Sequence, residues 1–397
     1  MASVPYKLFL VSAMLSTGTL NTILTKMQNR ICVDNCSDPN SNNHVMFEQP
    51  IWQTLNMFIG EMVCLLVYGM GVLIERYRSQ HLTQDYEPIK NNTASYQSIS
   101  PSRDSTEGQI TDNQVPSSSE SNQAEIFGPE DIEEPVKLEL TGLSTFLMWI
   151  PTMCDIVAST LLNLGLIFVS ASVYQMLRGS LVIFAGFFSV KFLGHTLGRS
   201  QWISLFMIMV GVSIVGISSV VSSGDTSIGG RTREETIFGV CIILLAQVFG
   251  AAHIIAEEKV LNHYNLKPLR GVGLEGTFGC ITVGLMIPIL HYTIGYKNPG
   301  GFFDATAGYG QIMGNPSLFR LCIYIMFCIS MFNWSGLSIT KAISATSRST
   351  IDSTRTMFIW FISLGLGWES FSFLQVIGFA ILVYGTFIYN KVVASPF

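Results

Sequence analysis

The amino-acid sequence indicates an all-α membrane protein, with ten transmembrane helices forming two inverted five-helix repeats. Composition is the first reason, because 49% of the 397 residues are hydrophobic and only 12% are charged, whereas a soluble protein is about a quarter charged. The second is that ten apolar windows are each long enough for a spanning helix, which takes roughly 20 residues. The third is a residue spacing in the first half of the chain that recurs in the second half.

The ten windows carry most of the apolar residues, and a polar segment separates the second window from the third. The first window runs to Lys26 and has no convincing cleavage site, which favours a membrane anchor over a cleaved signal peptide. The third contains Pro151 and Asp155, and the fourth follows so closely that we expect a tight turn near Gly165. The windows are residues 6–26, 50–74, 142–163, 165–190, 201–221, 237–257, 269–291, 318–338, 347–366 and 371–390.

The lysine and arginine residues other than Arg178 and Arg355 predict that both termini face the cytosol. With the N-terminus inside, fourteen of these residues lie on the cytosolic side and six on the opposite side. An excess of Lys and Arg marks the cytosolic side of membrane proteins. The net charge of −5 is small and gives no indication of nucleic-acid binding.

Residues 77–138 form a polar cytosolic insert that we expect to be disordered. Ser, Thr, Asn and Gln are abundant in it, and such a composition buries too little apolar area to offset the entropy of ordering. Within it, Tyr86-Glu87-Pro88-Ile89 has the Tyr-x-x-apolar pattern that endosomal and lysosomal sorting adaptors bind. Tyr86 and Ile89 therefore belong either to a sorting motif or to an ordinary linker.

The first loop on the non-cytosolic side contains Cys32 and Cys36. In an oxidising lumen these two side chains can close a small disulfide loop. The eight cysteines otherwise include no Cys-x-x-Cys pair and no Cys/His spacing typical of a metal site. The sequence thus predicts no metal and no cofactor.

Two windows share a spacing that predicts an internal repeat. A pattern of Gln, Gly and Ile in the fifth window recurs at identical spacing in the tenth: Gln201, Gly211 and Ile214, then Gln375, Gly385 and Ile388. Five is an odd number, so two five-helix halves in series cross the membrane in opposite senses. Inverted repeats are common in secondary transporters, with the solute site between the halves. We expect the halves to be residues 1–223 and 236–397.

Arg178 and Arg355 place a charge inside the fourth and ninth windows, at counterpart positions of the expected repeat. A charge at the bilayer centre costs at least about 2.5 kcal/mol, so such a residue marks a path for ions or solutes by default. A guanidinium presents five donors in a rigid fork that suits phosphate or carboxylate. Both residues are candidates for substrate binding or gating. The alternative for Arg355 is a structural ion pair with Asp352, three residues earlier.

Glu61, Asp155 and Glu275 are the other acidic residues deep within the windows. Together with Asp352 they either balance the charge of the two arginines or take up protons, because a carboxyl group removed from water holds its proton more readily. Proton uptake would couple transport to a proton gradient.

A short polar segment joins the sixth window to the seventh, which begins with several glycines. Glu257 and Glu258 lie beside Lys259 at a helix end, where we expect them at the membrane interface. Four glycines at the start of the seventh window predict close helix packing: Gly271, Gly273, Gly276 and Gly279.

Uncharged polar side chains accompany the arginines and are candidates either for hydrogen bonds to a polar solute or for bridges between helices. They are Asn163, Ser170, Ser172, Tyr174, Gln175, Ser344, Thr346 and Thr350. The chain has no phosphate-binding loop of the G-x-x-x-x-G-K-[ST] type and no signature of an intramembrane protease. These absences argue against an enzyme.

Several short strings are informative in combination: Gly60-Glu61, Cys154-Asp155, the run from Ser170 to Gly179, Glu257-Glu258-Lys259, Pro268-Leu269-Arg270, Asp352-Ser353-Thr354-Arg355 and Gly367-Trp368-Glu369. Together they resemble the drug/metabolite transporter superfamily and, within it, the F branch of the solute carrier 35 family. The resemblance implies ten helices around a cavity lined by the first, third, fourth, sixth, eighth and ninth. It also implies relatives that exchange nucleotide sugars for nucleoside monophosphates, and carriers in lysosomal or other internal membranes.

The leading hypothesis is a secondary-active transporter that moves a small polar, anionic metabolite, nucleotide-sugar-like or related, across an internal membrane by alternating access. A membrane receptor or adaptor that recruits partners through the polar insert is the alternative. Expected partners are a small-molecule solute, membrane lipids and sorting adaptors, and the oligomeric state is open between monomer and homodimer. A lysosomal or endosomal membrane is favoured over the Golgi.

Overall fold

The computed structural model describes residues 4–36, 44–84, 138–169, 171–222, 233–367 and 373–389, most of which are helical. The chain divides into two compact units, Met1–Val72 with Lys137–Phe397, and Leu73–Val136. The second unit holds the end of α2, and all contacts and sites described below belong to the first. The predicted sorting motif at Tyr86 and Ile89 lies outside the described residues.

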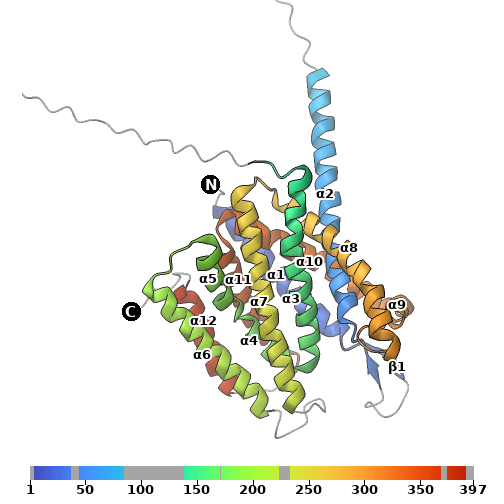
Figure 1. Cartoon of the computed structure of the whole chain (residues 1–397), viewed down its shortest axis with the longest axis vertical. Helices are drawn as coiled ribbons and strands as arrows, with labels where there is room; N and C mark the ends of the chain where they lie inside the picture. The colour runs from blue at the N-terminus through green and yellow to red at the C-terminus, as the bar shows by residue number, and fades with distance from the viewer. Residues whose placement is uncertain are drawn as a thin grey trace, which may run out of the picture. The chain divides into compact units, whose positions relative to one another are not determined.

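The elements follow the order of the predicted windows (Figure 1). They are α1 (Val4–Gln28), β1 (Cys32–Asp34), β2 (Val45–Met46), α2 (Pro50–Gln84), the 3-10 helix η2 (Gly142–Met148), α3 (Trp149–Phe168), α4 (Ala171–Arg178), α5 (Leu181–Leu193), α6 (Arg199–Ser222), α7 (Arg233–His263), α8 (Pro268–Thr293), the 3-10 helix η3 (Gly295–Lys297), α9 (Ala305–Gly314), α10 (Pro316–Ala342), α11 (Ala345–Gly365) and α12 (Phe373–Tyr389).

Eight helical segments of the described chain are long and apolar enough to cross a membrane, and the protein is a multi-pass integral membrane protein. They cover the first eight of the ten predicted windows. The ninth window forms α11, which carries Arg348, Asp352 and Arg355 and is therefore less apolar. The tenth forms α12, an apolar helix of 17 residues.

The fourth window contains a break that the sequence did not predict. The expected tight turn between the third and fourth windows is present but falls a few residues after Gly165, because α3 continues to Phe168 and α4 begins at Ala171. A Cβ at Gly165 would be 2.5 Å from Cγ1 of Ile243 in α7, so the glycine allows two helices to pack closely. The unpredicted break falls at Gly179 and Ser180, between α4 and α5, and Gly/Ser pairs are a common cause of helix kinks. Arg178 is thus the last residue of α4.

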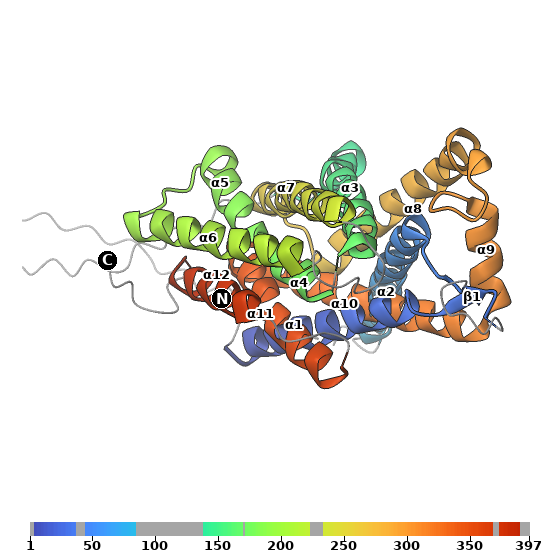
Figure 2. The ribbon, with the colours of Figure 1, turned by 90° about the horizontal axis from the view of Figure 1, so that it is seen from below.

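Three helix pairs form the centre of the fold: α3 packs along α7, α6 along α12, and α1 along α10. Figure 1 shows α3 beside α7 and α6 beside α12, and Figure 2 shows α1 alongside α10. The approach of α6 to α12 depends on glycine, because a Cβ at Gly211 would lie 2.7 Å from the backbone oxygen of Gly378. Each pair joins a helix from one predicted half to a helix from the other.

The glycines at the start of α8 allow it to pack tightly against α2, as predicted. A Cβ at Gly276 would lie 2.2 Å from the backbone nitrogen of Met62, and one at Gly273 would lie 2.5 Å from that of Leu65. A backbone atom cannot move aside as a flexible side-chain tip can, so these contacts require glycine. The prediction of close helix packing is confirmed.

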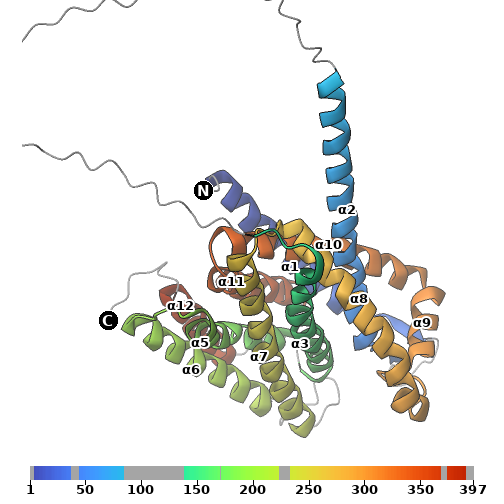
Figure 3. The ribbon, with the colours of Figure 1, turned by 45° about the horizontal axis from the view of Figure 1, so that its top comes forward.

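The loops at one end of the fold contain ordered structure that hydropathy does not reveal. Strands β1 and β2 pair antiparallel, and Cys32 and Cys36 form a disulfide. Helix α9, absent from the sequence-based expectation, begins after Asp304, whose carboxylate caps its N-terminus. The side chain of Gln49, beside α2, donates a 3.1 Å hydrogen bond to the carbonyl of Gly301. Figure 3 shows β1 and α9 side by side.

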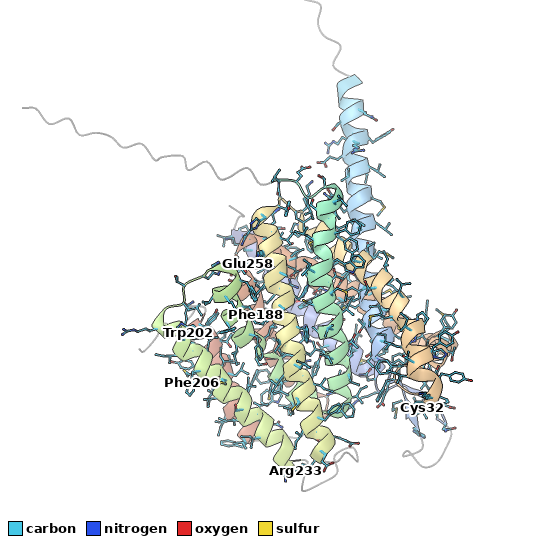
Figure 4. The ribbon with its side chains drawn as sticks, in the orientation of Figure 1. Cys32, Phe188, Trp202, Phe206, Arg233 and Glu258 are labelled. Atoms are coloured by element: carbon cyan, nitrogen blue, oxygen red, sulfur yellow. A yellow bond between two sulfur atoms is a disulfide. The ribbon has the colours of Figure 1, made fainter. Side chains whose placement is uncertain are left out.

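The outer faces of the helices carry large apolar side chains. Trp202 and Phe206 project from α6 and are 47% and 61% exposed (Figure 4). Exposed apolar surface of this kind is unusual for a soluble protein and suits helices that face lipid. The same figure shows Arg233 at the end of the fold where Cys32 lies, and Glu258 towards the other end of α7.

Candidate functional site

A polar cavity of about 150 Å³ lies among the helices of the first unit. Its walls come from α1, α2, α3, α4, α10 and α11. Six carboxamide side chains line it: Asn21, Gln28, Gln53, Asn56, Asn163 and Asn333. Polar groups facing the interior of a membrane bundle mark solute or ion paths by default, so this cavity is the candidate binding site.

The lining differs in one helix from the set that the family resemblance implies. The sixth spanning helix, α7, does not line the cavity, and α2 contributes through Gln53 and Asn56. The cause is the packing of α3 against α7. Asp155 of α3 faces the cavity and has its Oδ1 atom 3.9 Å from Nδ1 of His253 in α7, so α3 covers α7 here.

Arg178 and Arg355 reach the cavity from α4 and α11 and share one carboxylate, that of Asp352. Nη2 of Arg178 donates to Oδ2 of Asp352 at 3.4 Å, and Nη2 of Arg355 is 2.7 Å from Oδ1. Arg178 also donates to the hydroxyl of Tyr174 at 3.3 Å, one helical turn earlier. Two guanidinium groups against one carboxylate leave a surplus positive charge at this wall.

The ion pair between Arg355 and Asp352, one of the two alternatives that the sequence left open, is confirmed. It does not exclude the other alternative, because Arg355 also lines the cavity. The partner of Arg178 could not be found by examining one helical turn around it. Asp352 lies on a different helix, far along the chain.

The position of Arg355 depends on two neighbours. Its Cζ atom lies 4.7 Å from the ring centroid of Phe332, a cation–π contact. Gly18 of α1 leaves space for the guanidinium, because a Cβ there would be 2.6 Å from Nη1. Within the described part of the chain, the buried Nε atoms of Arg178 and Arg355 have no hydrogen-bond partner. These donors can therefore bind an anionic group.

The other predicted substrate-binding residues divide into two groups. Asn163 and Tyr174 line the cavity, whereas Gln175 and Ser344 do not. Gln175 is fully buried, at 0% exposed, and is not among the residues that line the cavity. Ser344 instead caps α11, where its Oγ accepts a hydrogen bond from the backbone N–H of Ser347.

A second charged group lies beside the cavity, and the sequence did not predict it. It centres on His253 of α7, whose Nε2 is 3.6 Å from Oε1 of Glu257 and 3.6 Å from Oε1 of Glu275 in α8. Nδ1 of His253 faces Asp155. His253 and Glu257 are four residues apart and therefore lie on the same face of a helix. This spacing was the one feature of the sequence that could have predicted the group.

Glu257 and Glu258 are more enclosed than their place at a helix end suggests. They are only 1% and 6% exposed, and their position at the membrane interface stays a prediction. Arg348 at the start of α11 pairs with Oε2 of Glu257 through Nη1. Glu258 accepts a hydrogen bond from the backbone N–H of Ala345. Contacts with α11 determine the burial of both carboxylates.

The predicted charge-balancing acids have different partners. Asp352 pairs with both cavity arginines, whereas Glu275 faces His253. Glu61 is 1% exposed and accepts a hydrogen bond from Nδ2 of Asn333. For a metal ion, His253, Glu257 and Glu275 offer ligand atoms that all lie within 4.8 Å of one another.

The fold and the cavity define a membrane protein of many spans that encloses a charged, polar site. A family model described as nucleotide-sugar transporter matches residues 134–309. Solute carrier family 35 member F6 of Homo sapiens is 32% identical over 394 residues, covering 98% of this chain and 90% of that protein. A Schizosaccharomyces pombe protein, uncharacterized protein C12G12.12, is 34% identical over 96% of this chain and 97% of its own length. The rat UDP-N-acetylglucosamine transporter is 29% identical over 43% of this chain and 50% of its own length.

The chain belongs to the solute carrier 35 family, in its F branch. It is a solute transporter of small molecules, and membership of a carrier family implies that it is not an enzyme. These relatives do not favour the alternative of a receptor or adaptor.

Proposed function

We propose that this protein is a secondary-active carrier of a small polar, anionic metabolite, nucleotide-sugar-like or related, and that the cavity between α1, α2, α3, α4, α10 and α11 is its binding site. The solute would contact Arg178, Arg355, Tyr174 and Asn163, which all line the cavity. Asp155 and Asp352 would balance the charge or take up a proton during transport. Gln175 and Ser344 would support α4 and α11 rather than touch the solute.

The observation that carries this proposal is the sharing of Asp352 by two arginines. The arrangement leaves one guanidinium charge in excess at the wall formed by α4 and α11, with Asp155 of α3 as the acidic residue that lines the cavity opposite, and it leaves two buried Nε donors without a hydrogen-bond partner among the described residues. A charge-assisted hydrogen bond to a guanidinium is about twice as strong as a neutral one. An anionic solute is therefore favoured at this wall over a neutral or cationic one.

Alternating access requires two halves that move relative to each other, and we take them as residues 1–223 and 236–397. Eight apolar helices together with α11 and α12 make ten spans, five in each half. The helix pairs support an inverted repeat, because exchanging each helix for its counterpart five spans away turns the α3–α7 pair into α10–α1. The same exchange turns α5–α7 into α11–α1 and leaves α6–α12 unchanged.

Contacts between α6 and α12 support the same repeat at single-residue level. A Cβ at Gly211 would meet the backbone oxygen of Gly378 at 2.7 Å, and one at Gly385 would meet that of Ser204 at 3.1 Å. By the spacing that makes Gly211 and Gly385 counterparts, Ser204 is the counterpart of Gly378. A twofold relation between the halves predicts this reciprocity of contacts.

The proposed topology has both termini in the cytosol, since the cytosolic side then carries more Lys and Arg. This orientation exposes Cys32 and Cys36 to an oxidising lumen, where disulfides form. We place the carrier in a lysosomal or endosomal membrane, with Tyr86 and Ile89 as the candidate adaptor motif.

Uptake by purified protein reconstituted into liposomes tests the proposal. The solutes to compare are nucleotide sugars, nucleoside monophosphates, other organic anions and organic cations, each at two pH values. Losing a charge-assisted hydrogen bond costs about 1.5–3 kcal/mol, so Arg178→Ala and Arg355→Ala should each lower anion transport about tenfold to a hundredfold.

Arg320→Ala is the matched control, because Arg320 is exposed at the start of α10 and its Nη2 donates to Oγ of Ser317. This variant should transport at the parental rate, as should a chain that lacks residues 80–135. Transport of anions at the parental rate by Arg178→Ala would remove this arginine from the mechanism. Selective transport of organic cations by the parental protein would overturn the anionic assignment.

A further inference from the structure

We propose that His253, Glu257 and Glu275 form a binding site for one divalent transition-metal ion of the Zn²⁺ or Mn²⁺ class, built between α7 and α8. None of the three side chains lines the polar cavity. The site is thus distinct from the one proposed for the solute, and it does not depend on the identity of that solute.

The ligand atoms have the type and spacing that such an ion requires. An imidazole nitrogen with carboxylate oxygens suits Zn²⁺ and Mn²⁺. Two ligands at about 2.1 Å from one ion are at most about 4.2 Å apart. Nε2 of His253 is 3.6 Å from Oε1 of Glu257 and 3.6 Å from Oε1 of Glu275, which fits this limit. The three ligand atoms all lie within 4.8 Å of one another, so the two carboxylate oxygens need to approach each other by at most about 0.6 Å to bind the same ion.

A buried nitrogen atom of His253 without a hydrogen-bond partner in the described chain indicates independently that a ligand binds here. It is 7% exposed, and its Nε2 atom lies equally far from two carboxylate oxygens without a hydrogen bond to a described residue. A hydrogen bond from imidazole N–H to oxygen is about 2.7–3.2 Å long, so 3.6 Å is too long for one. Oε1 of Glu275 is also buried and has no partner in the described chain. A nitrogen atom of His253 and a carboxylate oxygen of Glu275, both without a hydrogen-bond partner in the described chain, thus face each other, and a metal ion between them would bind both.

The opposite side of the histidine ring faces a carboxylate, at a distance longer than a hydrogen bond. A histidine that binds a metal through one nitrogen usually directs its other nitrogen to a carboxylate, which orients the ring. Nδ1 of His253 faces Oδ1 of Asp155 at 3.9 Å. Oδ1 of Asp155 is held in turn by a 3.0 Å hydrogen bond from Oγ of Ser159.

Charge balance favours a divalent cation at this point. Four carboxylates gather here, those of Glu61, Asp155, Glu257 and Glu275, and within the described residues Arg348 is the one arginine or lysine that pairs with any of them. Arg348 binds Oε2 of Glu257, which leaves Oε1 directed towards His253. Unbalanced negative charge is costly at the depth of a membrane, and a divalent ion bound to neutral imidazole removes two units of it.

Metal analysis of the purified full-length protein tests this site without reference to transport. Bound metal is first removed from the protein with a chelator. The protein is then incubated with Zn²⁺ or Mn²⁺ and separated from unbound metal, and the metal content per chain is measured by elemental mass spectrometry. One ion per chain is expected. Co²⁺ in place of Zn²⁺ should give visible absorption bands, which report the ligand geometry directly.

Substitutions of similar shape separate a metal site from a network of ion pairs. Glu275→Gln and His253→Gln should each lose the bound ion and the Co²⁺ bands. Asp155→Asn should weaken binding about tenfold, because the carboxylate that orients the imidazole loses its charge. Glu258→Gln is the control that should retain the ion, because Glu258 is a neighbouring buried carboxylate bonded to Ala345 rather than to His253. Failure of the parental protein to retain any tested ion would overturn the proposal, as would equal occupancy in Glu275→Gln.

Discussion

Single side chains in this protein show how charges are kept inside a membrane bundle. Asp352 accepts from Arg178 across helices and faces Arg355 within α11, so removing its charge would leave two buried cations without a counter-ion. Of these contacts, only the one between Asp352 and Arg355 was visible in the sequence, since it lies within one helical turn. Arg178 finds its partner through tertiary packing, which local spacing does not contain.

Replacing Asp352 by Asn should therefore destabilise the protein strongly. Breaking a buried ion pair by removing one partner costs about 3–5 kcal/mol, because an uncompensated charge stays buried. Thermal unfolding of the detergent-purified protein measures the effect. Glu139→Gln, at an exposed surface position, should change the stability by no more than about 0.5 kcal/mol. An Asp352→Asn variant as stable as the parent would show that Asp352 is not the main counter-ion.

Asp304, outside the membrane-spanning helices, gives a prediction about pH. The backbone N–H of Gly300 is the largest cause that lowers the pKa of Asp304 to about 2, and bonds from Thr306 and Ala307 add to it. Because the pKa is depressed on folding, the stabilisation is complete above the unfolded value of about 3.9 and is lost only as the pH falls through about 2.

Asp304→Ala should consequently cost about 1 kcal/mol, as for other N-cap residues, and the cost should be equal at about pH 7 and about pH 5. Thermal unfolding at the two pH values measures it. Asn315→Ala is the control, since Asn315 caps α10 without an ionisable group. A loss that shrinks towards pH 5 for Asp304→Ala alone would contradict the low pKa.

The sequence predicted helices well where hydropathy alone determines their position. It predicted them less well where capping residues or contacts with other helices determine where they begin and end. All ten windows correspond to helical segments, but the split between α4 and α5 was missed because Val173–Leu193 as a whole is apolar enough to be taken as one continuous span. Helix α9 was missed for the opposite reason, since its polar caps rather than an apolar run determine where it begins. The cavity was predicted through its arginines, while the cluster around His253 requires α7 and α8 to meet.

The crossing of α6 and α12 gives a prediction at the level of one helix. A Cβ at Gly211 would lie 2.7 Å from the backbone oxygen of Gly378. Gly211→Ala should therefore destabilise the protein by about 1–3 kcal/mol, as overpacking does. At Gly216, on the same helix, the nearest atom to a Cβ is Cγ1 of Val240 at 3.9 Å. Gly216→Ala should be neutral or stabilising by up to about 1 kcal/mol.

Thermal unfolding of the two variants side by side is the measurement. Both substitutions add the same methyl group to α6, so helix propensity cancels in the comparison and the contact with α12 accounts for the difference. Equal stability of Gly211→Ala and Gly216→Ala would mean that α6 and α12 can separate without cost.

At the level of the whole molecule, the two proposed halves are interleaved rather than independent. The α1–α10, α3–α7 and α6–α12 pairs each join residues 1–223 to residues 236–397. A half on its own would expose the faces that these pairs bury, including the surface around Gly211. The sequence repeat suggested two halves, but it did not contain the information that most of the close packing lies between them.

Expressed separately, residues 1–223 and 236–397 should each be unstable, and expressed together they should assemble. Helices that pack through close glycine contacts associate within a bilayer without a covalent link, because packing rather than connectivity drives their association. Co-purification through a tag on one half, followed by thermal unfolding of the complex, measures this. The two halves should fail to assemble when the first carries Gly211→Ala and should still assemble when it carries Gly216→Ala. This difference would show that assembly depends on the close contact between α6 and α12. Either half forming a stable, monodisperse species alone would contradict the interleaved arrangement.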